Sequence, residues 1–176
     1  MVRGSIVRRL TAVALAAALT ACSEPTTAPR LDESEPNLNV IAPSGLLVCP
    51  NTTFDFAWSL VGRLGGLLSL NGHQVIFAPQ SLLSLAFVTI REPISPYVEI
   101  EVRVNGREHY QFAQPVTVVL DYSRCPDSSL PDGPLTAWQI DPSTNAFIQD
   151  MHAVDDRAAR TVTFTTDHFS GYAVAQ

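Results

Sequence analysis

Short strand-forming runs separated by turn residues constrain the fold of this chain more than any other feature. From Gly45 onward, runs rich in Val, Ile, Thr, Phe and Tyr are interrupted about every ten residues by Gly, Pro, Asn or Asp. Few of the intervals between these turns could hold a helix of about ten residues or more. The pattern therefore predicts an all-β fold, an antiparallel β-sandwich of two sheets.

The clearest strand covers residues 97–104, where Val and Ile at the even positions alternate with the charged residues Glu99, Glu101 and Arg103. Alternation with a period of two places the apolar side chains on a buried face and the charged ones in water. Glu99 and Glu101 share one face, as a catalytic carboxylate pair would. Because Arg103 lies beside them, we interpret them as part of a solvated face.

Two Asn-Gly pairs supply the positive φ angles that tight hairpin turns need. Asn71-Gly72 predicts one hairpin, and Asn105-Gly106 predicts a second that returns through residues 108–112. Residues 81–86 are expected to form a helical turn. The remaining predicted strands are 46–49, 54–60, 67–70, 74–77, 85–90, 116–122, 135–140, 147–151, 160–166 and 171–175.

The first 21 residues have the features of an export signal. Arginines at the start precede an apolar segment of about 12 residues that begins at Leu10 and ends with Leu19-Thr20-Ala21, directly before Cys22. This segment resembles bacterial lipoprotein precursors, which implies cleavage before Cys22, lipidation of its thiol and acylation of its new amine. Ser23, where sorting signals for the inner membrane carry Asp, favours the outer membrane if the cell is Gram-negative. The expected location is therefore the bacterial cell envelope, with the membrane bound through Cys22.

Residues 22–44 are rich in Pro, Ser, Thr, Asp and Glu and show no apolar periodicity. Such a segment cannot bury enough apolar surface to offset the entropy lost on ordering. It is therefore predicted to be a flexible tether. The domain organisation that follows is a signal peptide over 1–21, a lipidated tether over 22–44 and one β-sandwich domain over 45–176.

The charge of the mature chain excludes one class of partner. After removal of the signal peptide, eight arginines remain against 17 acidic residues, which gives a formal net charge of −9. An acidic chain without a basic stripe is not expected to bind nucleic acid. The histidines outside the last strands are scattered, and no zinc spacing, phosphate loop or nucleophile elbow occurs. We therefore predict no metal, no cofactor and no enzymatic activity on an external substrate.

Cys49 and Cys125 are the two cysteines that remain after Cys22. An even pair in an oxidising compartment favours a disulfide bond. Two free buried thiols are the alternative. The sequence therefore predicts a Cys49–Cys125 bridge that closes a long loop.

Four segments of the domain carry further motifs. They read VGRLGGLL from Val61, FAPQSL from Phe77, FAQPVT from Phe112 and DHFSGY from Asp167. In this order they resemble landmarks of the ZU-5 domain, the β-sandwich module of netrin receptors, ankyrins and zonula occludens proteins, over about residues 61–174. The resemblance implies a β-sandwich whose partner is another protein.

Two positions in these motifs carry local expectations. Gln80 stands where the family has a glycine, so the turn after Pro79 is expected to avoid the positive φ that glycine allows. The pair Gly65-Gly66 indicates a strand entry where another backbone segment approaches too closely for a Cβ atom.

The tripeptide His168-Phe169-Ser170 is the one constellation with catalytic potential. In some relatives with ZU-5 domains, a His-Phe-Ser tripeptide cleaves itself between Phe and Ser. By this resemblance, His168 would act as the base and the Ser170 hydroxyl would attack the Phe169 carbonyl, which requires a strained peptide bond. In the structural alternative, Phe169 fills the core while His168 and Ser170 make hydrogen bonds at strand ends.

These observations predict a membrane-anchored lipoprotein with a binding or structural β-sandwich that interacts with an unknown envelope protein. An autoproteolytic domain is one alternative. A carbohydrate-binding module is another, because Trp58 and Trp138 could form a sugar platform, although tryptophan in a small sandwich is more often core. A protein-binding sandwich should expose an apolar patch on one sheet.

Overall fold

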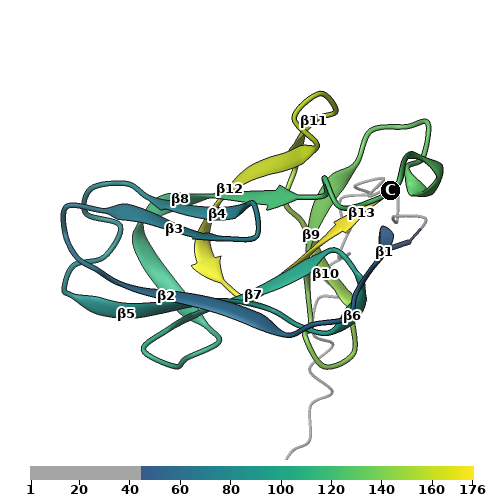
Figure 1. Ribbon diagram of the computed structural model, residues 1–176. Coiled ribbons are helices and arrows are strands. Elements are labelled where there is room, and N and C mark those ends of the chain that lie inside the picture. The colour runs from purple at the N-terminus through teal and green to yellow at the C-terminus, as the bar shows by residue number, and fades with distance from the viewer. Residues whose placement is uncertain (1–44) are drawn as a thin grey trace, which may run out of the picture. The chain divides into compact units, whose positions relative to one another are not determined.

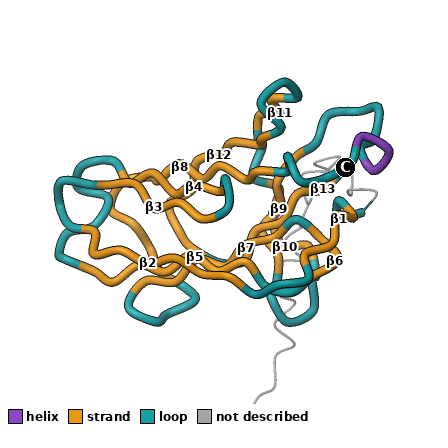
Figure 2. Tube along the Cα trace, in the orientation of Figure 1, coloured by secondary structure: helices purple, strands orange, loops and turns teal. Residues whose placement is uncertain are grey.

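The computed structural model describes residues 45–176. The predicted signal peptide, the tether and the lipidation site Cys22 lie outside the described residues. Within residues 45–176 the chain is all-β, and its single helical element is one short 3₁₀ turn, η1 (Asp127–Ser129). This part of the chain contains no helix of sufficient length and apolar character to span a bilayer. Figures 1 and 2 show the strands and the loops that join them.

Thirteen strands make up the described region. In chain order they are β1 (Val48–Asn51), β2 (Asp55–Val61), β3 (Gly66–Leu70), β4 (His73–Phe77), β5 (Ala86–Glu92), β6 (Ser95–Tyr97), β7 (Glu99–Val104), β8 (Tyr110–Asp121), β9 (Thr136–Ile140), β10 (Phe147–Asp150), β11 (Val154–Asp156), β12 (Thr161–Phe169) and β13 (Gly171–Ala175).

The strands form two large antiparallel sheets and one small one. The six-stranded sheet has the order β10-β9-β13-β7-β5-β2, and the five-stranded sheet has the order β11-β12-β8-β4-β3. Strands β1 and β6 pair with each other as a two-stranded sheet. In Figure 1 the layer of β3, β4, β8 and β12 lies over the layer of β2, β5 and β7. The predicted antiparallel β-sandwich is confirmed.

The core lies between the two large sheets and follows from strand alternation. On β5, Val88 and Ile90 are fully buried while Thr89 between them faces outward. Val102 of β7 continues this inner layer. Val75 of β4 and Val118 of β8 are buried on the opposing sheet. Each fully buried Val or Ile side chain contributes roughly 1.5–3 kcal/mol, so this layer is the main source of stability.

Aromatic rings fill one part of the core. Phe112 of β8 and Phe169 of β12 meet edge to face with ring centroids 4.4 Å apart, and Phe77 of β4 lies 6.0 Å from each of them. Edge-to-face contacts of this kind are favourable because the positive ring edge meets the negative face. Phe169 is therefore a core residue, as expected if the His168-Phe169-Ser170 tripeptide has a structural role.

At Asn105-Gly106 the predicted turn is confirmed, but the prediction that the next strand pairs back onto β7 as a hairpin is wrong. Both residues have the positive φ angles expected, 52° and 76°, and Val104 bridges Arg107. The chain then leaves the six-stranded sheet and enters the other one as β8, which pairs with β4 and β12. The physical reason is that both edges of β7 are already occupied, by β5 and β13. The hairpin predicted at Asn71-Gly72 is confirmed between β3 and β4.

Three other local predictions need correction. The strands predicted around 108–112 and 116–122 are parts of one long strand, β8, and Pro115 lies in the stretch where its register against β12 shifts. A proline is tolerated there because the ladder is interrupted. Residues 81–84 form bends without a helical turn, and the short strands β6 and β11 were not predicted.

Of the two local expectations, the one for Gly65 is confirmed and the one for Gln80 is wrong. Gly65 has a φ of 77°, and a Cβ atom there would collide with the Phe77 carbonyl, which confirms the expected close approach. Gln80 has a φ of 67°, so the expectation that its turn avoids positive φ is wrong. Its backbone N–H donates to the Arg63 carbonyl at 2.8 Å, and this bond holds the unfavourable conformation in place.

Cys49 and Cys125 form the predicted disulfide bond, with Cα atoms 5.3 Å apart. The bridge joins β1 to the loop after β8. Both cysteines are buried, so the bond is sequestered from solvent.

Replacing both cysteines by alanine should lower the free energy of unfolding by roughly 4 kcal/mol, because the bridge removes loop-closure entropy from an unfolded chain. The two cysteines are 76 positions apart, which makes this loop long. Urea denaturation of the double variant measures the effect. An unchanged midpoint and slope would contradict this account of the bridge.

Candidate functional site

The predicted catalytic residues His168 and Ser170 contact different partners. The His168 ring nitrogens lie 2.9 Å from an Asp167 carboxylate oxygen and 3.0 Å from the Gln139 amide oxygen. The Ser170 hydroxyl is buried and points to the Ile140 carbonyl at 3.4 Å. Hydrogen bonding with His168 is the main cause of the lowered pKa of Asp167.

The peptide groups around Phe169 are held by ordinary hydrogen bonds. The Tyr172 hydroxyl donates to the His168 carbonyl at 2.6 Å, and the Thr166 hydroxyl donates to the same oxygen at 2.9 Å. Burial raises the pKa of Tyr172, which keeps this hydroxyl protonated as a donor. These contacts match the strand-end hydrogen bonds of the structural alternative, and self-cleavage stays an untested hypothesis.

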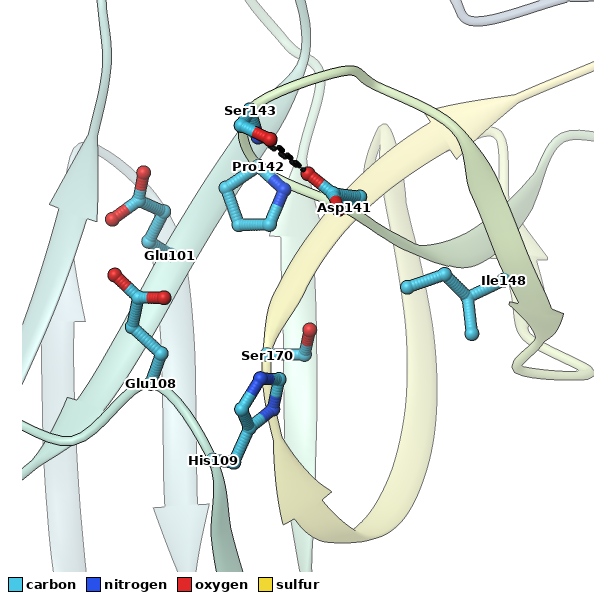
Figure 3. Close-up of a pocket in the computed structure, with 8 residues that line it drawn as sticks. All are labelled: Glu101, Glu108, His109, Asp141, Pro142, Ser143, Ile148 and Ser170. Atoms are coloured by element: carbon cyan, nitrogen blue, oxygen red, sulfur yellow. Dashed lines mark hydrogen bonds between the residues drawn. The ribbon is translucent and has the colours of Figure 1, made fainter.

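Beside Ser170 a cavity of about 330 Å³ opens on the outer face of the six-stranded sheet (Figure 3). We call it the Ser170 pocket, and its lining residues are Glu101, Glu108, His109, Asp141, Pro142, Ser143, Ile148 and Ser170. The guanidinium of Arg103 lies 3.1 Å from Glu101 and 2.6 Å from Glu108, so these two carboxylates share one cation. Asp141 accepts hydrogen bonds from Ser143, chiefly from its side chain, and they lower the pKa of Asp141.

A second cavity of about 210 Å³ adjoins the first and shares Glu101 and Pro142 with it. Glu99 lines this cavity, which we call the Glu99 pocket. The expectation that Glu99 belongs to a solvated face is wrong, because the residue is only 8% exposed. The outer face of β7 is central in the sheet and is covered by the 93–96 segment and the 142–145 turn, which sequence alternation alone does not reveal.

An apolar strip lies on the outer face of the same sheet, at its β2 edge. It consists of Phe56, Trp58 and Leu60 of β2 and Phe87 of β5, which are 54%, 57%, 58% and 41% exposed. Trp58 and Phe87 have ring centroids 5.2 Å apart, and Leu60 pairs with Phe87 across the strands. The strip is contiguous, which distinguishes it from the single exposed apolar residues that any surface carries.

The two tryptophans do not form a common platform. Trp58 is on the edge strand β2, whereas Trp138 is on β9 with three strands between them. Trp138 is only 6% exposed and packs with Ile140 and Ala173, so it fits the core interpretation. Trp58 does not fit that interpretation, because it is exposed.

The sequence contains a signal for the apolar strip that strand alternation does not reveal. Between Phe56 and Ile90, Arg63 is the only Asp, Glu, Lys or Arg, although the chain contains 28 such residues in total. A globular surface normally carries charges along such a length. Their scarcity over residues 56–90 indicates that part of this surface is apolar.

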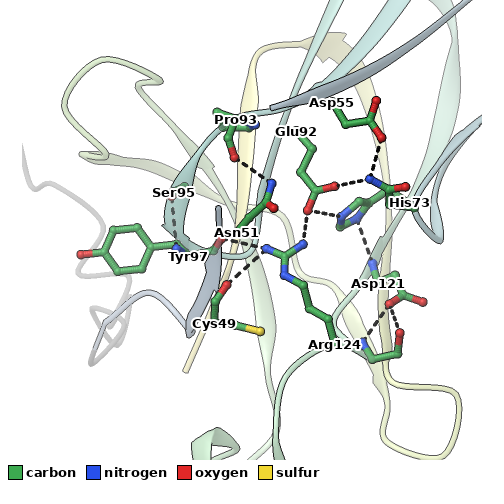
Figure 4. A network of polar contacts seen from close by, with 12 residues as sticks. Cys49, Asn51, Asp55, His73, Glu92, Pro93, Ser95, Tyr97, Asp121 and Arg124 are labelled. Carbon is green, nitrogen blue, oxygen red and sulfur yellow. Dashed lines mark hydrogen bonds and ion pairs between the residues drawn. The ribbon is translucent and has the colours of Figure 1, made fainter. Parts of the chain in front are cut away.

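A buried polar network joins the two sheets near the disulfide (Figure 4). Its centre is Glu92 of β5, which is 3% exposed. Arg124 forms an ion pair with Glu92 and donates to the carbonyls of Cys49 and Tyr97 at 3.3 and 3.1 Å. The Asn71 amide donates to Glu92 at 2.9 Å. The network therefore ties β1 and β6 to the main sandwich.

The tautomer of His73 follows from its contacts. The backbone N–H of Asp121 donates to His73 Nδ1 at 3.0 Å, which leaves the ring proton on Nε2, 3.7 Å from Glu92. Burial alone raises the pKa of Glu92, but the contacts with His73 and Asn71 and the charge of Arg124 outweigh it and hold the pKa at about 2. This network is a structural device, because Glu92 is bonded by Arg124 and Asn71, and Arg124 also bonds to backbone carbonyls.

Within residues 45–176, no three His, Cys, Asp or Glu side chains are grouped so as to hold a metal ion. Comparison of the sequence with known protein families and with curated proteins finds no match. The ZU-5 resemblance therefore stays a prediction, and the fold and the geometry carry the functional argument.

Lowering the pH should remove the stability that ionised Glu92 supplies. The pKa of Glu92 is about 2 in the folded protein and 4.5 in the unfolded chain. Its contribution to stability is therefore fully present above pH 4.5 and is lost as the pH falls towards 2. We expect the difference in unfolding free energy between wild type and Glu92→Gln to shrink by roughly 3 kcal/mol over this range.

Urea denaturation at several pH values measures this difference. Asp132→Asn is the matched control, because Asp132 is exposed and its substitution changes the net charge equally. Parallel stability curves for wild type and Glu92→Gln would show that Glu92 is not held ionised by the network.

For the His168-Phe169-Ser170 tripeptide, we expect no self-cleavage, because the His168 ring and the Ser170 hydroxyl bond to other groups. Mass spectrometry of the denatured protein should find wild type and Ser170→Ala both uncleaved. Release of the fragment 170–176 from wild type alone would establish autoproteolysis.

Proposed function

We propose that this protein is a bacterial lipoprotein, anchored in the cell envelope through lipidated Cys22, whose β-sandwich binds another envelope protein. The apolar strip is the observation that carries the binding role. Buried apolar and aromatic side chains supply most of the energy of protein interfaces, and tryptophan and tyrosine are frequent among the dominant residues. The N-terminal sequence supports the anchor, since an arginine-rich start, an apolar run and Cys22 follow one another.

The position of the strip at a sheet edge supports the same proposal. β2 is the last strand of the six-stranded sheet and pairs regularly with β5 over seven residues. It carries no proline, glycine, bulge or basic residue, which are the devices that protect exposed edges. A partner that covers the strip would also shield this edge, whether or not it adds a strand of its own.

The anchor can be tested by metabolic labelling. Full-length protein grown with a palmitate analogue should be labelled and should fractionate with membranes, whereas Cys22→Ala should be unlabelled. A wild-type protein without label would reject the lipoprotein proposal, whatever the strip binds.

The binding role can be tested by crosslinking in the intact envelope. We expect wild type to form a discrete crosslinked complex that Trp58→Ser and Phe87→Ser reduce at least about fivefold, because each removes a large buried contact. Val154→Ser is the matched control, since Val154 is 71% exposed on β11 of the other sheet. Equal loss with all three variants, or no loss with any, would show that the strip is not the binding surface.

Carbohydrate binding is a second candidate, favoured by the exposed Trp58 ring beside Phe87. Aromatic faces provide apolar contact for sugar rings. Quenching of tryptophan fluorescence by envelope sugars, abolished in Trp58→Ser, would support this function over protein binding.

A further inference from the structure

The Glu99 pocket contains a buried carboxyl group that, within the described region, lacks an ion-pair partner and has one oxygen without a hydrogen bond. Glu99 Oε2 is buried and has no hydrogen-bond partner among the described residues, and the side chain that bonds to this carboxyl is Ser95. No cationic side chain of residues 45–176 forms an ion pair with Glu99, whereas its neighbour Glu101 is paired with Arg103. Burial of an unpaired carboxylate is costly, and burial is the main cause of the raised pKa of Glu99.

The surroundings of Glu99 determine what kind of ligand could satisfy it. The pocket volume of about 210 Å³ is much smaller than a typical drug-sized site. Its walls include the apolar Ile94, Pro96 and Pro142 and the polar Ser95 and Asn145, while Glu99 and Glu101 contribute carboxyl groups. Apolar walls beside carboxylates match a cationic group on a hydrocarbon stem, because the stem contacts the walls while the charge meets the acid.

The chain packing explains why the pocket lies here. One of the two strands beside β7 is β13, and its outward residues next to Glu101 and Glu99 are Gly171 and Ala173. Because glycine has no side chain and alanine has only a methyl group, little projects from the outer face of the sheet at this point. The 93–96 segment and the turn after Asp141 rise around it, so the carboxyl groups lie in a depression.

We propose that the Glu99 pocket binds a primary ammonium or guanidinium group on an aliphatic stem, such as a lysine or arginine side chain. The ligand supplies the positive charge that Glu99 lacks and donates hydrogen bonds to the Glu99 carboxyl group. The pocket opens on the same sheet face as the apolar strip, but this inference does not depend on the proposed envelope role.

The test uses the full-length protein and small probes of matched shape. Ligand-observed NMR should detect binding of Nα-acetyl-lysine methylamide and Nα-acetyl-arginine methylamide, and no binding of the uncharged Nα-acetyl-norleucine methylamide. n-Butylammonium and a short Lys-containing peptide separate the two sources of the cation, because a free-amine site favours the former and a peptide site the latter.

Glu99→Gln should weaken binding of the cationic probes at least about tenfold, because it removes a charge-assisted hydrogen bond. Its thermal stability should be unchanged or higher, since an unpaired buried charge is lost. Asp132→Asn makes the same change in net charge outside the pocket and should leave affinity unchanged.

Three results would overturn the proposal. One is the absence of binding by both cationic probes. Another is equal binding of the norleucine probe, which would show a merely apolar cavity. The third is an equal loss of affinity in Glu99→Gln and Asp132→Asn, which would show attraction by the overall negative charge of the protein.

Discussion

The apolar layer between the two large sheets is the constraint on which the rest of the structure depends. A strand that alternates apolar and polar residues can bury only one face, and a second sheet must cover that face. Val88 and Val102 on one sheet and Val75 and Val118 on the other satisfy this requirement completely. Once the layer has formed, the outward residues of each strand have fixed positions, and these include the apolar strip on β2 and β5 and the carboxylates Glu99 and Glu101 of β7.

The elements outside this layer depend on polar and covalent links instead. β1 and β6 form only a two-stranded sheet, which is marginal by itself. The disulfide holds β1, and Arg124 connects its backbone and that of β6 to the buried Glu92. An ion pair with one buried partner adds little net energy compared with an apolar contact, but Arg124 links three segments at once through its bonds to Glu92, Cys49 and Tyr97.

The outer face of the six-stranded sheet concentrates the functional potential of the described region. Its β2 edge carries the apolar strip, and its centre carries the Glu99 pocket. One feature offers apolar contact area and the other an unpaired carboxyl group, so the two suit different chemical groups. The His168-Phe169-Ser170 tripeptide, by contrast, is accounted for by packing and strand-end hydrogen bonds.

The sequence by itself determined the all-β class, most strand positions, the Asn71-Gly72 hairpin and the Cys49–Cys125 bridge, because these depend on local periodicity, turn chemistry and a cysteine count. Only the tertiary structure decided that the chain after Asn105-Gly106 changes sheets, since that depends on which strands already occupy the edges of β7. It also decided that Glu99 is buried and Trp58 is exposed. Alternation says which residues share a face, but the exposure of a face depends on the segments that cover it, and these are distant in sequence.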